Sequence, residues 1–251
     1  MERKKYNVHY FEPEDGLEQY PYELSVEVQE KCEKLEKYFL KFYTDDVLEK
    51  AKKEAKIESE SKKYIKDNFI YGEVNFRSIS YILLYLNNVY KIKEGYFYDL
   101  GSGTGRAIIG SVLTHNFEKY IGIELLTSLY NTSMGIKSSF DKDFDIFYKN
   151  NKQLLPEYKT ENKPDINFIN GDFLKVDLSS ASVIFINSTT FSEKLLNDLA
   201  MKFNEECQSG CLVVNTTQEL SKLDKNKWEF LPYFRRYMSW GIVTINVYKR
   251  K

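Results

Sequence analysis

The stretch Tyr98-Asp99-Leu100-Gly101-Ser102-Gly103-Thr104-Gly105-Arg106 decides how the rest of this chain of 251 residues is interpreted. An apolar, aromatic run precedes Asp99, glycines alternate after it, and apolar residues then recur at helical spacing. This order predicts a strand, a sharp turn and the start of a helix. Glycine is needed where the backbone φ is positive or a ligand touches the main chain, and a helix start favours an anion. We therefore expect the turn to bind a nucleotide-like small molecule.

The composition is that of a globular protein with a sizeable core. Hydrophobic residues make up 42% and aromatic residues 16%, while 36 Lys and Arg nearly balance 37 Asp and Glu. We expect one large domain, or a catalytic domain with a small helical attachment. The charge balance carries no strong nucleic-acid signature. No apolar run approaches the ~20 residues of a membrane span, and the charged start lacks a signal-peptide core. We expect a soluble, intracellular protein, cytoplasmic or nuclear, and a monomer is compatible with this composition.

Residues that bind metals do not form a recognisable set. His9 and His115 are isolated, and Cys32 has no cysteine near it in the sequence. The pair Cys207 and Cys211 lacks the second pair of ligands that a zinc site needs. We expect structural thiols and no metal site.

Residues 1–67 are expected to form a helical N-terminal region ahead of a catalytic domain over 68–251. An apolar stripe at helical spacing predicts a helix from Ser25, with the residues Val28, Cys32, Leu35, Phe39 and Phe42. Thr44, followed by Asp45 and Asp46, is a typical start for a second helix. The charged segment 47–63 is expected to be a solvated helix or loop, with a docking surface as the alternative.

After Tyr71-Gly72-Glu73 one more helical pattern follows, and strand and helix patterns then alternate. Apolar residues on one side predict a helix through Ile79, Ile82, Leu83 and Leu86. Strands are expected near 96–100, 120–124, 166–170, 181–187 and 211–215, and helices near 105–115, from about 126 and over 192–206. The polar stretch 141–165 is expected to be a surface excursion, and 228–248 to form two more strands. The alternation predicts a doubly wound α/β fold, which is a Rossmann-like, seven-stranded sheet with helices on both faces.

Acidic and aromatic residues follow the predicted strands where such folds bind ligands. Glu124 ends the second strand, and its carboxylate can accept both hydroxyls of a ribose. Asp172 and Phe173 follow the third strand, where an acid can accept the adenine amino group and a ring can cover the base. Together with Asp99, these residues predict an adenosine-containing ligand.

The glycine spacing separates two classes of adenosine ligand. Dinucleotide-binding folds use G-x-G-x-x-G, whereas Asp99-x-Gly101-x-Gly103-x-Gly105 resembles the first motif of class I S-adenosylmethionine-dependent methyltransferases. Further motifs resemble the disruptor-of-telomeric-silencing (DOT) family, which contains the non-SET histone-lysine methyltransferases. These motifs, which span about 68–248 in the family's order, are Tyr71-Gly72-Glu73, Gly122-Ile123-Glu124, Gly171-Asp172-Phe173, Val183 to Phe191 and Ser239-Trp240-Gly241.

The resemblance implies S-adenosyl-L-methionine as cofactor and a role for each matching residue. The implied cofactor-binding residues are Tyr71, Glu73, Asp99, Gly101, Gly103, Gly105, Glu124, Asp172, Phe173 and Asn187. Among them, Tyr71 and Glu73 would close over the methionine end, and Asp99 would face its amino group. The residues implied around methyl transfer are Asn187, Phe191, Tyr71 and Trp240, with Trp240 helping to wall a lysine channel.

The chain also departs from the family pattern. Arg106 stands where the family usually has Gln, and Val74 where a hydroxyl residue is common. The segment Asn187-Ser-Thr-Thr-Phe191 replaces Asn-Asn-Phe-Ala-Phe and so loses the middle aromatic residue. This puts the shape of the acceptor channel in question.

The first hypothesis is a protein-lysine methyltransferase, with a histone or nucleosome among the candidate substrates. It needs neither a nucleophilic residue nor a metal, because the sulfonium is already activated. An apolar slot would favour the uncharged amine, and Asn187 or a water would orient its lone pair. The alternatives are a small-molecule methyltransferase and a cofactor-binding module without turnover. If nucleosomes are bound, the Lys-rich region 47–66 is the expected contact.

Overall fold

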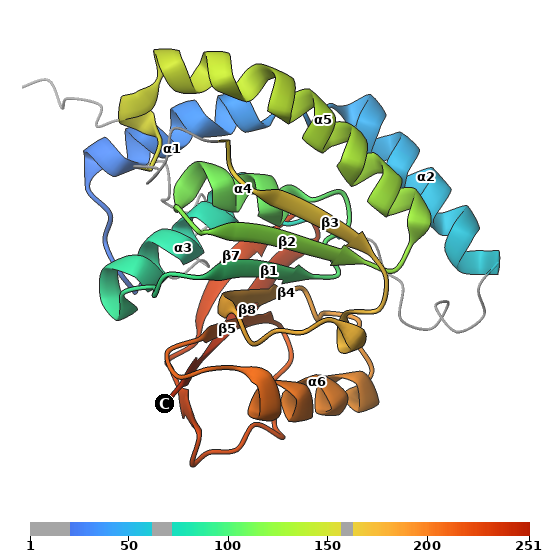
Figure 1. Cartoon of the computed structure of the whole chain (residues 1–251), viewed down its shortest axis with the longest axis vertical. Coiled ribbons are helices and arrows are strands. Elements are labelled where there is room, and N and C mark those ends of the chain that lie inside the picture. The colour runs from blue at the N-terminus through green and yellow to red at the C-terminus, as the bar shows by residue number, and fades with distance from the viewer. Residues whose placement is uncertain (1–20, 62–71, 157–162) are drawn as a thin grey trace, which may run out of the picture.

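A computed structural model describes residues 21–61, 72–156 and 163–251 (Figure 1). The first half of the described chain contains α1 (Val26–Phe39), α2 (Asp45–Ser61), α3 (Phe76–Tyr90), β1 (Tyr96–Leu100), α4 (Arg106–Thr114), β2 (Lys119–Glu124), α5 (Thr127–Asn150) and η1 (Lys152–Leu154). The second half contains β3 (Ile166–Asn170), η2 (Phe173–Lys175), β4 (Ala181–Ile186), α6 (Glu193–Glu206), β5 (Leu212–Thr216), β6 (Trp228–Phe230), β7 (Phe234–Met238) and β8 (Gly241–Arg250).

The strands form one mixed sheet whose order creates a ligand-binding edge. The order is β3-β2-β1-β4-β5-β8-β6, with β7 also paired to β8, and only the pairings of β8 are antiparallel. After β1 the chain builds outward through β2 and β3, and then returns to place β4 on the other side of β1. Ligands of such sheets bind where the strand order reverses, at the carboxyl ends of the strands. The predicted doubly wound fold is confirmed, and its switch point lies between β1 and β4.

The sheet has eight strands where the sequence predicted seven. The C-terminal tail forms three strands, because β6 and β7 together occupy the free edge of the long strand β8. Pro232 lies between β6 and β7. Proline has no N–H to donate to a ladder, so it interrupts an edge strand.

Helices cover both faces of the sheet, as predicted (Figure 1). On one face α1, α3, α4 and α5 contribute to a core cluster with Phe97 of β1 and Phe185 of β4. On the other face α6 packs with Tyr98, Leu100 and Ile184. This alternation of buried side chains on β1 and β4 is that of central strands buried on both faces.

The helix α5 corrects one prediction. Residues 141–150, expected in a surface excursion, continue the helix that begins at Thr127. Phe140 and Phe144 are buried one turn apart, and the ring of Phe147 stacks on Tyr38 with 3.5 Å between centroids. The polar composition of the stretch hid this continuing apolar stripe, which packs against α1.

The N-terminal helices form where they were expected and lie against the remainder of the fold, but α1 ends at Phe39, before the predicted stripe residue Phe42. Ser25 caps α1 by accepting a hydrogen bond from the N–H of Val28, and the stripe residues Cys32, Leu35 and Phe39 are buried. The helix α2 runs beside α5 (Figure 1). The boundary predicted between residues 67 and 68 lies outside the described residues and stays a prediction.

Three further features of the described residues bear on function. Cys32, Cys207 and Cys211 are free and buried, and burial raises the pKa of the Cys32 thiol to about 12. Within the described ranges no group of His, Cys, Asp and Glu side chains is arranged to hold a metal ion. No helix among them combines the length and apolar character needed to cross a membrane.

Candidate functional site

The glycine turn between β1 and α4 has the positive backbone angles that its sequence predicts. The φ angles of Gly101, Gly103 and Gly105 are +85°, +54° and +85°. The N–H of Gly101 donates to the carbonyl of Ile123 at 2.9 Å, which ties the turn to β2. No side chain of the described residues caps the following helix α4. The first N–H groups of any helix have no intrahelical partner. Because no side chain takes that place here, these N–H groups suit an anionic ligand group.

The Asp99 side chain is buried near the carboxyl end of β1. Its exposed fraction is 3%, and its carboxylate makes no hydrogen bond with any described residue. Burial, and secondly the negative charge of Glu124, raise the pKa of Asp99 well above its ordinary value. A buried carboxylate without a donor is costly, so a cationic or hydrogen-bonding ligand would relieve this site.

Glu124 supports the glycine turn from the neighbouring strand. One carboxylate oxygen accepts the N–H of Gly103 and the other that of Leu126, each at 2.8 Å. Burial raises the pKa of Glu124, and these hydrogen bonds oppose that rise. A carboxylate has about four acceptor sites, so the predicted contact to a ribose stays compatible with this geometry.

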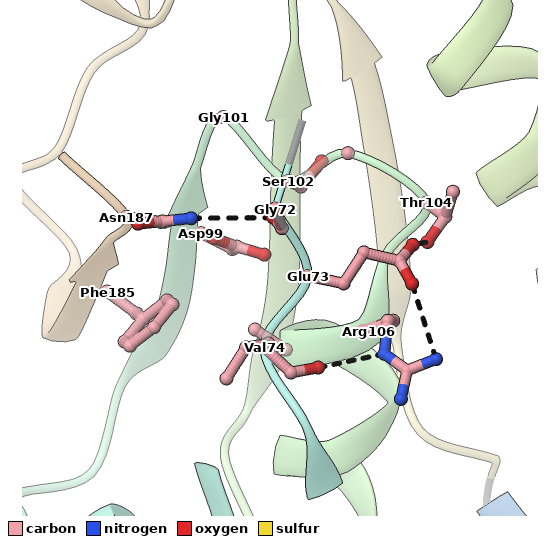
Figure 2. Close-up of a pocket in the computed structure, with 12 residues that line it drawn as sticks. Gly72, Glu73, Val74, Asp99, Gly101, Ser102, Thr104, Arg106, Phe185 and Asn187 are labelled. Atoms are coloured by element: carbon pink, nitrogen blue, oxygen red, sulfur yellow. Dashed lines mark hydrogen bonds and ion pairs between the residues drawn. The ribbon is translucent and has the colours of Figure 1, made fainter. Parts of the chain in front are cut away.

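Glu73 and Val74 are held against the start of α4 (Figure 2). The Thr104 hydroxyl donates to Glu73 Oε1 at 2.9 Å, and Arg106 Nη1 lies 3.6 Å from Glu73 Oε2. Arg106 Nε also donates to the main-chain carbonyl of Val74 at 2.8 Å. Tyr71, predicted to act with Glu73, lies outside the described residues.

The predicted late aromatic motif lies against the same segment. The Ser239 hydroxyl accepts the N–H of Glu73 at 3.0 Å, and the N–H of Ser239 donates to the Glu73 carbonyl at 3.3 Å. A Cβ added at Gly72 would lie only 2.4 Å from the ring of Trp240, so glycine is required for this approach. The structure thus brings Trp240 together with the Gly72–Val74 segment.

Asn187 has a fixed amide orientation at the end of β4. Its Oδ1 accepts hydrogen bonds from the hydroxyls of Thr216 at 2.8 Å and Thr189 at 3.0 Å. Its Nδ2 consequently faces the carbonyl of Gly72 at 3.5 Å (Figure 2). Asn187 therefore joins the Gly72 segment to β4 across the pocket.

The hydroxyl residues that replace the family's residues after Asn187 bind the next loop. The N–H of Ser188 donates to the Thr216 hydroxyl at 3.1 Å, and the Ser188 hydroxyl donates to the Thr216 carbonyl at 2.7 Å. The Thr189 and Thr217 hydroxyls lie 3.1 Å apart. Gln218 Nε2 donates to the carbonyls of Ser188 and Phe191, each at 3.0 Å. Polar contacts thus fix this segment where the family pattern has an aromatic side chain.

The predicted adenine-side residues lie beside the turn. The rings of Phe173 and Phe191 stack with 5.8 Å between centroids, and a Cβ added at Gly101 would lie 3.9 Å from Phe191. Asp172 accepts the N–H of Leu174 at 2.9 Å and so caps the short helix η2. Phe173 and Phe191 thus form one aromatic pair next to Gly101.

A pocket that is partly open to solvent unites part of this set. Its lining contains the predicted residues Glu73, Asp99, Gly101, Gly103 and Asn187. The predicted residues that stand outside its lining are Gly105, Glu124, Asp172, Phe173, Phe191 and Trp240.

The lining also contains residues to which the sequence assigned no role. Ser102, Thr104 and Phe185 were not predicted, and Arg106 was noted only as a departure from a family pattern. Ser102 Oγ is buried and has no hydrogen-bond partner among the described residues. Ser102 and Thr104 lie between the glycines, so their place in the turn was a usable signal. Phe185 is one residue of a uniformly apolar strand and gave none.

The charges of the pocket suit a zwitterionic group. Arg106 and Glu73 neutralise each other, which leaves Asp99 as the uncompensated carboxylate. Asp99 favours a cation, whereas the start of α4 favours a carboxylate. The pocket can therefore hold the amino and carboxylate groups of an amino acid at one end of a ligand.

Comparison with known proteins identifies relatives of the chain. A family model described as the histone methylation protein DOT1 matches residues 43–229, which is more than half of the chain. The H3 lysine-79-specific histone-lysine N-methyltransferase of Caenorhabditis elegans is 29% identical over 150 residues. That alignment covers 60% of this chain but 15% of the relative, so the chain spans a small part of the relative's length.

One of two similar solved structures has a TM-score above 0.5 and shares the fold. A putative methyltransferase, yhhF of Escherichia coli, has a TM-score of 0.51 at 12% identity and covers 74% of this chain and 90% of its own. An RNA methyltransferase of Salinibacter ruber, solved in complex with S-adenosyl-L-homocysteine, has a TM-score of 0.43 at 19% identity over 67% of this chain and 90% of its own.

Proposed function

The chain belongs to the DOT1 family of histone methylation proteins, and we propose that it is an S-adenosylmethionine-dependent methyltransferase acting on a protein lysine side chain. The observation that supports this most is the pocket at the β1/β4 switch point. There Asp99, the glycine turn, Glu73 and Asn187 converge from segments far apart in the sequence. Methyl transfer to an amine needs these positioning groups and no nucleophilic residue.

The residues present fit the proposed cofactor. Ser102 Oγ is buried in the lining without a partner among the described residues, and the Asp99 carboxylate receives no hydrogen bond from them. A Cβ at Gly103 would meet no atom within 4 Å, so open space lies over the turn. When bound, S-adenosylmethionine supplies a methyl group on a positively charged sulfur.

Each group of residues in and around the pocket has a proposed task. Asp99 holds the amino group of the cofactor, and the start of α4 holds its carboxylate. Glu124 keeps Gly103 in place and directs an oxygen to the ribose. Phe173 and Asp172, beyond Gly101, hold the adenine.

The acceptor side of the site is formed by Asn187, Phe191 and Trp240. An amine must arrive uncharged, and burial against aromatic walls lowers the pKa of a lysine ammonium. Asn187, with its amide fixed by Thr216, orients the incoming nitrogen. Holding two reactants in line can contribute up to roughly 7–11 kcal/mol to catalysis.

A histone or nucleosome is the first substrate to examine, because the C. elegans relative is named for histone H3 lysine 79. The experiment incubates the protein with cofactor labelled in the methyl group and with histone octamers, nucleosomes or a cell lysate. Label should appear in protein. Transfer only into a protein-free metabolite extract would contradict a protein acceptor.

One observation favours a small-molecule acceptor as the second candidate. The hydroxyls of Thr189 and Thr217 meet at 3.1 Å where the family pattern has an aromatic side chain. Hydroxyl groups at this position suit a polar acceptor better than the aliphatic stem of lysine. The metabolite extract in the same assay separates the two candidates.

A further inference from the structure

The end of α1 reaches the pocket through Arg106. Its guanidinium carbon lies 5.0 Å from the ring centroid of Phe39 and 4.8 Å from that of Tyr43. Both rings are buried, and the Arg106 side chain is 11% exposed. A cation over aromatic faces is stabilised by about 0.5–2 kcal/mol, most strongly where water is excluded.

The same guanidinium holds the pocket wall. It hydrogen-bonds the Val74 carbonyl and pairs with the Glu73 carboxylate, as described above. The planar group can only make these contacts if its orientation is fixed. The rings of Phe39 and Tyr43 lie against the guanidinium and restrict that orientation.

The helix α2 makes a second contact, at the start of α5. Glu58 Oε1 accepts the N–H of Thr127 at 3.0 Å, and Glu58 Oε2 accepts the N–H of Ser128 at 2.8 Å. No residue of α5 itself supplies a side-chain cap. A carboxylate at this position satisfies free N–H groups and interacts favourably with the helix dipole.

This second contact adjoins the proposed ribose site. Leu126, directly before α5, donates its N–H to Glu124. Leu126 and Leu129 are packed against Ala51 and Ala55 of α2 in a small buried cluster. The turn that follows Glu124 is therefore held by α2 from outside the sheet.

We infer that the N-terminal segment 39–58 fixes the cofactor pocket at two points, with Phe39, Tyr43 and Glu58 as positioning residues. Phe39 and Tyr43 orient Arg106 against Glu73, and Glu58 holds the turn after Glu124. None of these three residues lines the pocket itself. The N-terminal helices are then part of the binding machinery. This inference rests on the proposed function, because the pocket is taken as a cofactor site.

The variant Glu58→Gln tests the contact to α5, with Glu60→Gln as its matched control. Glu60 is exposed on the same helix and makes no hydrogen bond or ion pair with a described residue. Calorimetric titration of S-adenosyl-L-homocysteine should show about tenfold weaker binding for Glu58→Gln and unchanged binding for Glu60→Gln. KM for the cofactor should rise, while kcat at saturating cofactor should stay near the wild-type value.

The pair Tyr43→Leu and Tyr43→Phe tests the contact to Arg106. The Tyr43 hydroxyl is buried without a hydrogen-bond partner among the described residues. Phenylalanine therefore retains the ring that contacts Arg106. We expect roughly fivefold weaker cofactor binding for Leu and wild-type binding for Phe. Melting curves of the free variants show whether each is folded.

Unchanged dissociation constants for both Glu58→Gln and Tyr43→Leu would overturn the inference, even if both variants melted at lower temperature. That result would show a purely structural role. If the wild-type protein did not bind S-adenosyl-L-homocysteine, the proposed function would fail, and the inference with it.

Discussion

The carboxylate of Glu124 lies 2.8 Å from the main-chain nitrogen of Gly103 and accepts its hydrogen bond. A side chain at the end of β2 thereby shapes the turn that follows β1. Because the same carboxylate also binds Leu126, it sets the relative position of two loops at the cofactor edge. The acid predicted to hold a ribose is thus also a structural part of the glycine turn.

Glu124→Gln should weaken cofactor binding by at least tenfold. The amide retains one oxygen but replaces the other acceptor with an NH₂ group, which would face an N–H donor. Hydrogen bonds to a charged group contribute about 1.5–3 kcal/mol each, and about 1.4 kcal/mol is a factor of ten. Titration calorimetry with S-adenosyl-L-homocysteine measures the loss. Wild-type affinity in this variant would show that Glu124 has no part in binding.

Binding to the Asp99 site should release a proton. In the free protein, burial and the charge of Glu124 raise the pKa of Asp99 above its ordinary value of 3.8. Because the folded state then binds the proton more tightly than the unfolded state, folding stability falls as the pH rises from 3.8 through the raised pKa. A cationic amino group beside Asp99 lowers that pKa again. Cofactor affinity should therefore fall as the pH is lowered through the raised pKa of the free protein.

Calorimetry in two buffers of different ionisation enthalpy measures the released proton directly. Asp99→Asn should bind the cofactor more weakly and lose most of the pH dependence of binding. The pH dependence that remains should come from Glu124, whose pKa is also raised by burial. Equal binding and equal proton release in the variant would contradict the assignment of Asp99.

Gly105→Ala should destabilise the fold. Gly105 has a φ of +85°, and an added Cβ would lie 2.6 Å from the ring of Phe168. The backbone strain alone costs about 1–2 kcal/mol, and the contact adds to it. Gly135→Ala is the matched control, since Gly135 lies within α5 with nothing within 4 Å of its Cβ.

Urea unfolding compares these two glycine variants. Alanine at 135 should stabilise by up to about 1 kcal/mol, because glycine is a poor helix former. If both variants had the same free energy of unfolding, the strain argued for the turn would be absent.

Thr216→Val should slow turnover more than it weakens cofactor binding. The Thr216 hydroxyl donates to Asn187 Oδ1, and without it the amide of Asn187 loses its fixed orientation. We expect kcat to fall about tenfold, because a misplaced positioning group slows the reaction. Thr132→Val, which removes a hydroxyl bonded only within α5, controls for the chemical change. A change in cofactor affinity with unaltered kcat would speak against this role.

The sequence predicts those candidate site residues whose positions depend on local structure. Gly101, Gly103 and Gly105 have the positive φ angles that favour glycine, and Asp99 and Glu124 lie at the carboxyl ends of apolar strands, so the pattern alone indicates them as candidates. Arg106 and Glu58 could not be assigned, because their roles depend on contacts with segments distant in the chain. Glu58 is one of many charges in a segment whose composition indicates only a solvated face.

The two errors in the predicted fold have a similar cause. The sequence predicts too short a helix α5, because polar residues after Phe140 outnumber the apolar residues that continue its buried face. The sequence predicts two strands in the tail instead of three, because the break at Pro232 between β6 and β7 is short and both strands pair with β8.

The central claim is methyl transfer to a protein lysine, and mass spectrometry of the acceptor tests it most directly. Nucleosomes and free histones are incubated with S-adenosylmethionine and either the wild-type protein or Asp99→Asn, then digested and mapped. We predict methylated lysine side chains with the wild-type protein and a strong reduction with the variant. Cofactor consumed without any methylated lysine, or equal methylation by the variant, would contradict the account.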